Sequence, residues 1–270
     1  MPSSDKMPIF LAVHGAWHRP ERFDMLKTLV EKHGYDFQAV RLASIGKFDK
    51  DPGDGLKLDI AVIANALRKI IHVGQDVVVL SHSYGGMPTS GGVATIMEEQ
   101  KAECGKSAHG KVIRLVYISA YVPLKGNSAA DENVLAGHEG GGPDTTIMLP
   151  TGMVEPRDPI SLMYNTTPKQ IAEDAMSKLA PSAISSFITG TELCGWADYG
   201  IPLSYIGCKQ DRAMPVSMQE MNVERVKSVD ADAGIYWLDT DHSPFLCAPE
   251  RVADILVDGL KLSQGSAGAA

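Results

Sequence analysis

The sequence predicts an α/β protein with a doubly wound, mostly parallel six-stranded sheet and a helical insertion. Two observations support this fold class: short apolar runs alternate with longer segments of helical period, and the runs are continuously apolar rather than alternating. Continuous runs are typical of parallel strands that helices cover on both faces. The alternation stops between about residues 123 and 201, which indicates an insertion. A chain of 270 residues can form one large domain, so we expect a single domain over 1–270.

Short β-rich runs are the predicted strands, and their regular alternation with helices favours parallel pairing. The runs are 9–13, 37–42, 76–81, 112–119, 202–207 and 234–238.

Three segments have the apolar period of amphipathic helices. The first spans 20–34, where Pro20 suits an opening turn and Gly34 a stop. The second spans 55–74 and ends at Gly74. The third spans 249–262. Each has an apolar stripe that can pack on the sheet.

Residues 124–200 form the predicted insertion. Its first part is Gly-rich and polar, and its second part reads as helices, with Thr167 expected to cap a helix that begins near Pro168. Because β-branched runs are rare here, we expect a mostly helical lid over the sheet rather than a separate sheet. The low-complexity tail 263–270 is expected to be disordered.

The composition excludes several classes of function. A net charge of -8 without a Lys/Arg cluster argues against nucleic-acid binding. We find no signal peptide and no membrane-spanning run, so we expect a cytoplasmic protein that acts on a small molecule and binds no membrane. The cysteines lack the spacing of metal sites, so we expect free thiols and no metal; they are Cys104, Cys194, Cys208 and Cys247.

The motif S-H-S-Y-G-G at 81–86 fits the nucleophile elbow G-x-S-x-G, with Ser81 in place of the first glycine. It follows the most apolar strand and precedes a segment of small residues that suits a helix. Small neighbours are needed because the nucleophile sits on a strained turn. Ser83 is therefore the candidate nucleophile, and the alternative is that it only caps a helix.

A serine nucleophile needs a histidine base, which in turn needs a carboxylate. Where the serine lies on a nucleophile elbow, the chain order is serine, then acid, then histidine, and the last two follow later strands. Asp211 follows the fifth predicted strand and His242 the sixth. Asp239 and Asp241 are alternative acids, but they are too near His242 in sequence to reach its far nitrogen easily.

The loop after the first strand, V-H-G-A-W-H, is expected to complete the site. The backbone amides of Ala16 and Tyr84 are the predicted oxyanion donors. We expect His14 to order this turn and His82 to be a packed, hydrogen-bonded core residue. Four further histidines are expected to face solvent: His33, His72, His109 and His138.

These motifs together make the chain similar to the α/β-hydrolase superfamily. Within it, the chain resembles the compact cofactor-free group that contains plant methyl-ester esterases, hydroxynitrile lyases and similar fungal and bacterial hydrolases. The resemblance rests on HGAW, SHSYGG, YISAYVP, Asp211 and DHSP at 241–244, and covers nearly the whole chain. It implies an α/β-hydrolase fold, a Ser83, Asp211 and His242 triad, and no cofactor.

Two departures restrict the chemistry that the resemblance implies. The lyases of that group carry a lysine directly after the catalytic histidine, where this chain has Ser243. Epoxide hydrolases and haloalkane dehalogenases of the superfamily use an aspartate as nucleophile, where this chain has Ser83. Both departures favour a serine hydrolase.

We therefore expect a hydrolase that cleaves a small to medium apolar carboxylic ester or lactone through an acyl-enzyme. Its activity should fall below roughly pH 6 to 7, because His242 must be neutral. The alternatives are a non-catalytic small-molecule receptor and a triad enzyme that performs carbon–carbon cleavage or acyl transfer. Under the insertion, the candidate pocket residues are Trp17, Tyr121, Met163 and Trp196.

Overall fold

A parallel sheet forms the centre of the molecule. The computed structural model describes residues 7–102, 110–137 and 145–266, with side chains as far as residue 260. Six parallel strands pair in the order β2-β1-β3-β4-β8-β9, which confirms the predicted sheet. The strands are β1 (Ile9–Val13), β2 (Phe37–Val40), β3 (Val77–His82), β4 (Val112–Ile118), β8 (Leu203–Cys208) and β9 (Gly234–Leu238).

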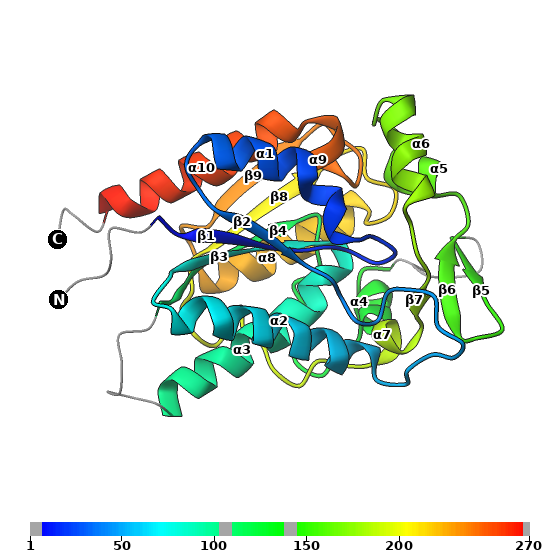
Figure 1. The fold of residues 1–270 in the computed structure, drawn as a ribbon, viewed down its shortest axis with the longest axis horizontal. Helices are drawn as coiled ribbons and strands as arrows, with labels where there is room; N and C mark the ends of the chain where they lie inside the picture. Colours follow the sequence, from blue (N-terminus) through cyan, green and yellow to red (C-terminus); the bar gives the residue numbers. More distant parts are fainter. Residues whose placement is uncertain (1–6, 103–109, 138–144, 267–270) are drawn as a thin grey trace.

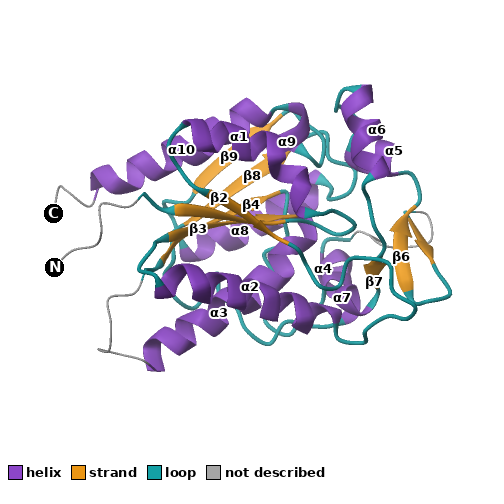
Figure 2. Cartoon of the chain, in the orientation of Figure 1, coloured by secondary structure: helices purple, strands orange, loops and turns teal. Residues whose placement is uncertain are grey.

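Helices cover both faces of this sheet, as Figures 1 and 2 show. One face carries α1 (Asp24–Lys32), α9 (Pro244–Cys247) and α10 (Pro249–Ser266). The other carries α2 (Gly55–His72), α3 (Gly86–Ala102) and α8 (Val216–Val229). Two short 3₁₀ helices, η1 (Pro20–Phe23) and η2 (Ser83–Gly85), precede α1 and α3. None of the helices in the described ranges combines the length and hydropathy that a membrane span requires.

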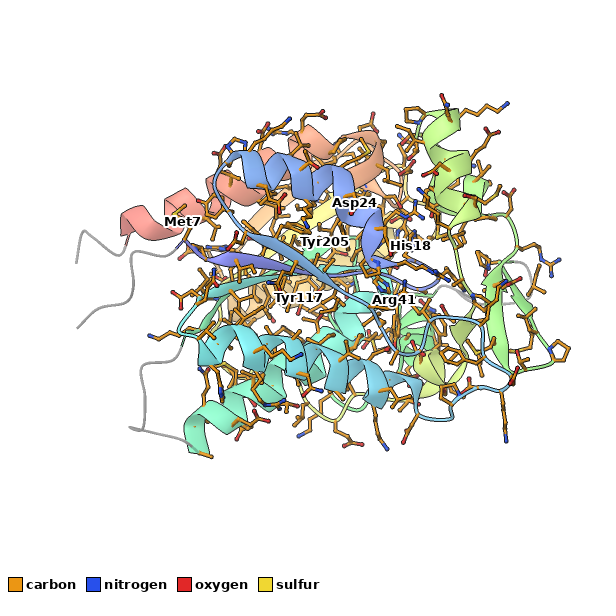
Figure 3. The ribbon with its side chains drawn as sticks, in the orientation of Figure 1. Met7, His18, Asp24, Arg41, Tyr117 and Tyr205 are labelled. Atoms are coloured by element: carbon orange, nitrogen blue, oxygen red, sulfur yellow. The ribbon has the colours of Figure 1, made fainter. Side chains whose placement is uncertain are left out.

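The hydrophobic core lies in two layers because successive strand residues point to opposite faces. On β1, Leu11 packs toward α2 and α3, and Phe10 packs toward α1 and α10. Tyr117 and Tyr205 are fully buried on neighbouring strands and lie near the centre of the molecule in Figure 3. Burial on both faces explains why the strand sequences are continuously apolar.

The segment between β4 and β8 contains the expected helices, but the expectation that it has no sheet of its own was wrong, because it also contains a three-stranded antiparallel sheet. Gly152, at φ 80°, makes the turn between the first two of these strands. The strands are too short for a recognisable apolar run. The elements are α4 (Ala129–Leu135), β5 (Thr146–Met148), β6 (Met153–Pro156), α5 (Pro159–Met163), α6 (Lys169–Ser177), β7 (Ser182–Ala183) and α7 (Ser185–Ile188).

The insertion lies beyond the carboxyl ends of the central strands, on the side away from both chain termini (Figure 1). This is the edge where ligands bind in open α/β sheets. The insertion therefore faces the loops that carry the candidate catalytic residues.

Two local expectations were wrong. Thr167 does not cap α6, because its hydroxyl donates instead to Asp241 Oδ2 at 2.8 Å and Pro168 occupies the cap position. The last helix does not stop before the tail, since α10 continues to Ser266. Residues 267–270 of that tail lie outside the described residues.

Candidate active site

The elbow that carries Ser83 joins β3 to η2 and α3. Ser83 has φ 53°, in the left-handed region that non-glycine residues rarely adopt. At Gly86 a Cβ atom would lie 1.9 Å from the carbonyl oxygen of Tyr121, so only glycine fits. Ser81 stands where the motif has glycine, and its hydroxyl donates to Thr89 Oγ1 at 2.8 Å. The helix that follows the elbow thus satisfies this buried hydroxyl.

The acid and the base lie on neighbouring loops after β8 and β9. His242 Nδ1 donates to Asp211 Oδ2 at 2.7 Å, and both side chains are buried. The other oxygen, Asp211 Oδ1, accepts from the backbone amides of Ala213 and Met214 at 2.7 and 2.8 Å. Because Nδ1 carries the proton that the carboxylate accepts, Nε2 of His242 is left free to take a proton.

Neither alternative acid contacts the imidazole of His242 through its carboxylate. Asp239 is exposed and accepts from Gln210 Nε2. Asp241 is buried, and its Oδ2 accepts from the backbone amides of Thr166 and Thr167 at 2.9 and 2.7 Å. Its carboxylate therefore fixes the loop that precedes the histidine.

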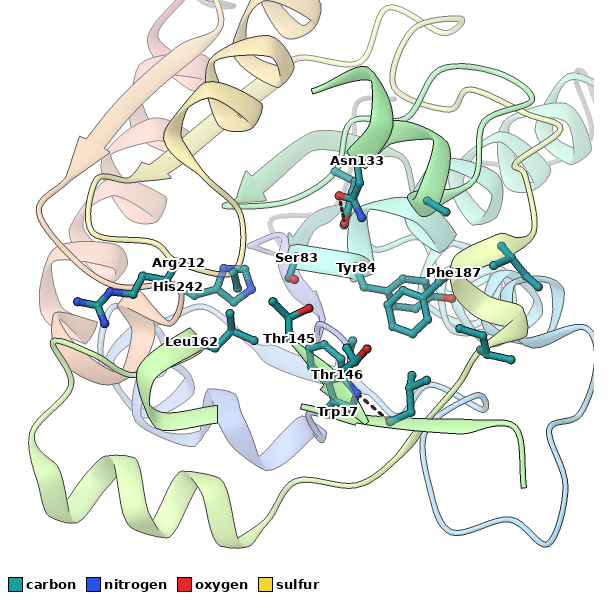
Figure 4. Close-up of a pocket in the computed structure, with 17 residues that line it drawn as sticks. Trp17, Ser83, Tyr84, Asn133, Thr145, Thr146, Leu162, Phe187, Arg212 and His242 are labelled. Atoms are coloured by element: carbon teal, nitrogen blue, oxygen red, sulfur yellow. Dashed lines mark hydrogen bonds between the residues drawn. The ribbon is translucent and has the colours of Figure 1, made fainter. Parts of the chain in front are cut away.

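Ser83 and His242 line the same cavity, as the close-up in Figure 4 shows. Among the described residues no hydrogen bond joins Ser83 Oγ to the imidazole. Catalytic hydrogen bonds are often long in ligand-free structures and tighten when substrate binds. The arrangement places a serine, a histidine and a carboxylate in the same order as the serine, histidine and aspartate of a catalytic triad.

Ala16 and Tyr84 line this cavity beside Ser83. Within the described ranges, neither of their backbone amides donates a hydrogen bond to another protein group. The Tyr84 hydroxyl, in contrast, donates to Asp59 Oδ2 at 2.9 Å and so anchors the residue after the nucleophile. Two backbone donors are thus available to an anionic oxygen formed at Ser83.

The cavity has a volume of about 180 Å³ and is mainly apolar. Its walls come from the loop after β1 (residues 14–18, here called the oxyanion loop), the elbow and the insertion, and Arg212 lies at one end beside His242 (Figure 4). Besides Ser83 and His242, the walls of the cavity include Trp17, Tyr121, Val154, Leu162, Ile184 and Phe187.

Of the predicted pocket residues, Trp17 and Tyr121 line the cavity, and Met163 and Trp196 do not. On the short helix α5, Leu162 faces the cavity, and its neighbour Met163 is buried in the core on the α1 and α10 side. Trp196 is buried in the other core layer, where its Nε1 donates to the carbonyl oxygen of Pro123 at 2.8 Å. These two predictions were wrong because sequence does not give side-chain direction in an irregular insertion.

Two functional neighbours lay inside the quoted motifs but were missed. Ser119, in YISAYVP, is fully buried with φ 39°, and its hydroxyl donates to Asp211 Oδ2. His18, at the end of VHGAWH, donates from Nδ1 to the carbonyl oxygen of Ala16 at 2.7 Å and accepts at Nε2 from the Tyr164 hydroxyl at 2.8 Å. Their partners are remote in sequence, so no local pattern identifies their roles.

His82, His14 and His18 are buried beside the site, and burial lowers the pKa of each. His82 Nε2 donates to the carbonyl oxygen of His242 at 2.8 Å, and His14 Nε2 accepts from the amide of Leu42 at 3.2 Å. His14 and His82 thus bind backbone groups, which agrees with the structural roles expected of them.

Where the structure describes the chain, the remaining histidines and cysteines form no second centre. His33 and His72 are exposed, and His109, His138 and Cys104 lie outside the described residues. Of the other cysteines, Cys194, Cys208 and Cys247 are free thiols. In the described part of the chain, His, Cys, Asp and Glu side chains form no group of three that could hold a metal ion.

Comparison with known proteins identifies the family of the chain. An alpha/beta hydrolase family model matches residues 10–255. Alpha/beta hydrolase nvfD from Aspergillus novofumigatus is 26% identical, over 92% of this chain and 95% of its own. Norfluorocurarine synthase 2 from Strychnos sp. is also 26% identical, over 92% and 94% of the two chains.

Solved structures share the fold. Polyneuridine aldehyde esterase superposes with a TM-score of 0.73 at 21% identity and covers 94% of this chain and 99% of its own. A pyrethroid hydrolase from Sphingobium faniae gives a TM-score of 0.70 at 19% identity, over 93% and 96% of the chains. The family match over most of the chain and the hydrolase relative indicate a hydrolytic enzyme, and the chain belongs to the alpha/beta hydrolase family.

Proposed function

We propose that this protein is a serine hydrolase that cleaves carboxylic esters or lactones through an acyl-enzyme intermediate. The observation that carries the proposal is the Asp211–His242 hydrogen bond at 2.7 Å on the cavity that Ser83 lines from a strained elbow. A strained serine turn and a carboxylate-bound histidine on one cavity are the parts that acyl transfer needs.

In the acylation step, Ser83 Oγ attacks the carbonyl carbon while His242 Nε2 takes the hydroxyl proton. The carbonyl oxygen becomes an oxyanion, and the amides of Ala16 and Tyr84 donate to it. The tetrahedral intermediate then expels the alcohol oxygen, which receives the proton from His242. Asp211 stabilises the imidazolium through Nδ1 during both transfers.

In the deacylation step, a water molecule takes the place of the alcohol. His242 Nε2 removes a proton from the water, the hydroxide attacks the acyl carbon, and the same amides bind the second oxyanion. Collapse returns the proton to Ser83 Oγ and releases a carboxylic acid. A lactone follows the same steps, except that the leaving alcohol stays attached to the acyl group.

The walls of the cavity favour a small to medium apolar substrate. Trp17 and Phe187 pack with ring centroids 6.1 Å apart, and Val154, Leu162 and Ile184 complete an apolar surface. Burial of such a substrate stabilises the complex by about 25 cal/mol per Å² of apolar area. Two structural neighbours are an esterase and a pyrethroid hydrolase, which supports an ester as the bond cleaved. The cytoplasmic location stays a prediction.

Replacement of the nucleophile tests the proposal. Ser83→Ala should lower kcat on p-nitrophenyl esters by about 10⁴-fold or more, because the acyl-enzyme cannot form. Ser90→Ala is the matched control: Ser90 is a buried serine on α3 that donates to the carbonyl oxygen of Leu193. This control should keep its activity. A panel of acyl chain lengths and lactones on the wild-type protein gives the size of the substrate.

A fluorophosphonate probe distinguishes an enzyme from a non-catalytic receptor. The wild-type protein should be labelled at Ser83, and the Ser83→Ala variant should not. Absence of labelling would indicate a receptor rather than an enzyme. A fall in kcat of less than tenfold in Ser83→Ala would refute the assignment of the nucleophile.

A further inference from the structure

The oxyanion loop contains a backbone conformation that its own sequence does not favour. Trp17, directly after Ala16, has φ 62°. A bulky residue in this region costs on the order of 1–3 kcal/mol and persists only where its surroundings fix it. The loop therefore needs an anchor outside the β1 region.

That anchor is a short stretch of the insertion, residues 180–183, which we call the strap. The amide of Ala180 donates to the carbonyl oxygen of Trp17 at 2.9 Å, and the amide of Trp17 donates to Ser182 Oγ at 2.8 Å. Both backbone polar groups of the strained residue are thus held by the strap. Ser182 is only 1% exposed, so water does not compete for this bond.

The other side of the strap holds the loop after β2, which connects with the second oxyanion donor through hydrogen bonds. The amide of Gly46 donates to the carbonyl oxygen of Pro181, and the amide of Ala183 donates to the carbonyl oxygen of Ser44, both at 2.9 Å. Ser44 in turn donates from its amide and its hydroxyl to Asp59, at 2.9 and 2.6 Å.

Asp59 also accepts from the hydroxyl of Tyr84, whose amide is the second donor. The strap therefore contacts the residue next to Ala16 directly, and connects with Tyr84 through Ser44 and Asp59. Two further hydrogen bonds join the insertion to the oxyanion loop. Trp17 Nε1 donates to the carbonyl oxygen of Val154 at 2.9 Å, and the Tyr164 hydroxyl donates to His18 Nε2.

We propose that Ser182 is a positioning residue of the oxyanion hole, which fixes Trp17 in its left-handed conformation and so aims the Ala16 amide at the reacting oxygen. Ser182 does not line the cavity and acts through Trp17. The inference rests on the proposed function, since the oxyanion exists only if Ser83 attacks a carbonyl. The insertion then helps to orient an oxyanion donor in the transition state, besides forming part of the cavity wall.

Substitution of Ser182 tests this role. Ser182→Ala leaves the Trp17 amide without its acceptor and releases the strained conformation. Removal of an entire oxyanion donor lowers kcat by about 10²–10³-fold, and a displaced donor should lower it by about 10- to 100-fold. KM should stay within about twofold, because ground-state binding does not use the hole. Binding of a short trifluoromethyl ketone, which forms a tetrahedral adduct, should weaken by the same factor as kcat.

The matched control is Ser185→Ala. Ser185 lies in the same insertion, is similarly buried, and its Oγ also accepts a backbone amide, that of Gly55 at 3.1 Å. The Ser185→Ala variant removes an equivalent hydrogen bond at a residue that does not contact the oxyanion loop. It should therefore lower the thermal stability but not kcat. Ser182→Thr keeps a hydroxyl and should recover most of the activity.

The outcomes separate this inference from the proposed function. If the wild-type protein is neither labelled by a fluorophosphonate nor active on p-nitrophenyl butyrate, the proposed function fails. If the wild-type protein is active but Ser182→Ala and Ser185→Ala have equal kcat and equal affinity for the ketone, the positioning role is refuted. A rise in KM with unchanged kcat in Ser182→Ala also refutes it.

Discussion

Asp59 is a buried acid beneath the nucleophile elbow, and its pKa gives a test of how the site is supported. The side chain is fully buried on α2 and accepts from Ser44 and from the Tyr84 hydroxyl. Burial raises the pKa of Asp59, and the hydrogen bonds from Ser44 and Tyr84 offset this only in part. Desolvation of the carboxylate thus outweighs its hydrogen bonds.

The substitution Asp59→Asn removes the charge and keeps the shape. When wild-type Asp59 is protonated, both side chains are neutral, and the variant should be less stable by about 1 kcal/mol for one mismatched hydrogen bond. A carboxyl whose pKa is raised on folding stabilises the protein below its unfolded pKa, and this contribution is lost as pH rises through the folded pKa. As pH rises, the wild-type advantage in free energy of unfolding should therefore shrink in total by about 1.4 kcal/mol for each unit by which folding raises the pKa of Asp59.

Urea denaturation of both proteins from about pH 4 to 8 measures this difference, because it yields the free energy of unfolding at each pH. Asp51→Asn is a control of opposite sign. Although burial would raise the pKa of Asp51, hydrogen bonds from Ser185 and Gly53 lower it. The wild-type advantage over Asp51→Asn should thus grow only at the acid end of this range, as pH rises past the ordinary carboxyl pKa of 3.8, and should then stay constant. An advantage over Asp59→Asn that also grows with pH would refute the reasoning, because Asp59 would then be stabilised as the anion.

Two further predictions concern the elbow and the buried histidines. At Gly15 a Cβ atom would lie 2.7 Å from Ser83 Cβ, so Gly15→Ala should slow fluorophosphonate labelling by about 100-fold through displacement of the nucleophile. Gly46→Ala, whose Cβ would meet only Phe48 at 3.4 Å, is the control, and equal labelling rates would contradict this. Burial lowers the pKa of His14 to about 4 and those of His18 and His82 well below normal. Their stabilisation is complete above the unfolded pKa of about 6.5 and is lost as pH falls, so the free energy of unfolding should decrease from pH 6.5 to 4. Urea titrations that show constant stability over this range would contradict it.

The sequence predicted the central sheet well because its signals are local. Each strand is a continuous apolar run, and the boundaries moved only slightly, as where β2 ends at Val40 rather than at residue 42. The small sheet of the insertion could not be predicted, because β7 has only two residues and exists by pairing with β6. Its stability depends on contacts remote in sequence.

The residues of the candidate site also divide into those that local motifs identify and those whose roles depend on partners remote in sequence. Ser83, Asp211 and His242 could be named because each follows a recognisable strand, and the structure brings Asp211 to His242. Ser119 and His18 could not be assigned roles, because their partners Asp211 and Tyr164 are 92 and 146 residues away. Motifs indicate which loops meet at the sheet edge, but which side chains touch there is decided by packing.

Backbone strain is concentrated where the proposed chemistry takes place. In the described ranges, Trp17, Ser83 and Ser119 are the non-glycine residues with positive φ. They follow β1, β3 and β4, which are adjacent in the sheet, and lie beside the oxyanion donor, at the nucleophile and against the acid. Strain of about 1–3 kcal/mol at each is comparable in sum with the net stability of a domain, so each residue needs a partner that fixes it.

Each strained residue has such a partner on a different element. Ser182 accepts from the amide of Trp17, the carbonyl oxygen of Ser83 accepts from the amide of Tyr121 at 3.2 Å, and Ile206 accepts from the amide of Ser119 at 2.8 Å. Since Tyr121 and Ser119 belong to one loop, displacement of that loop would disturb the nucleophile and the acid together. The carboxyl edge of the sheet and the strap thus act as one support, and the catalytic geometry depends on both.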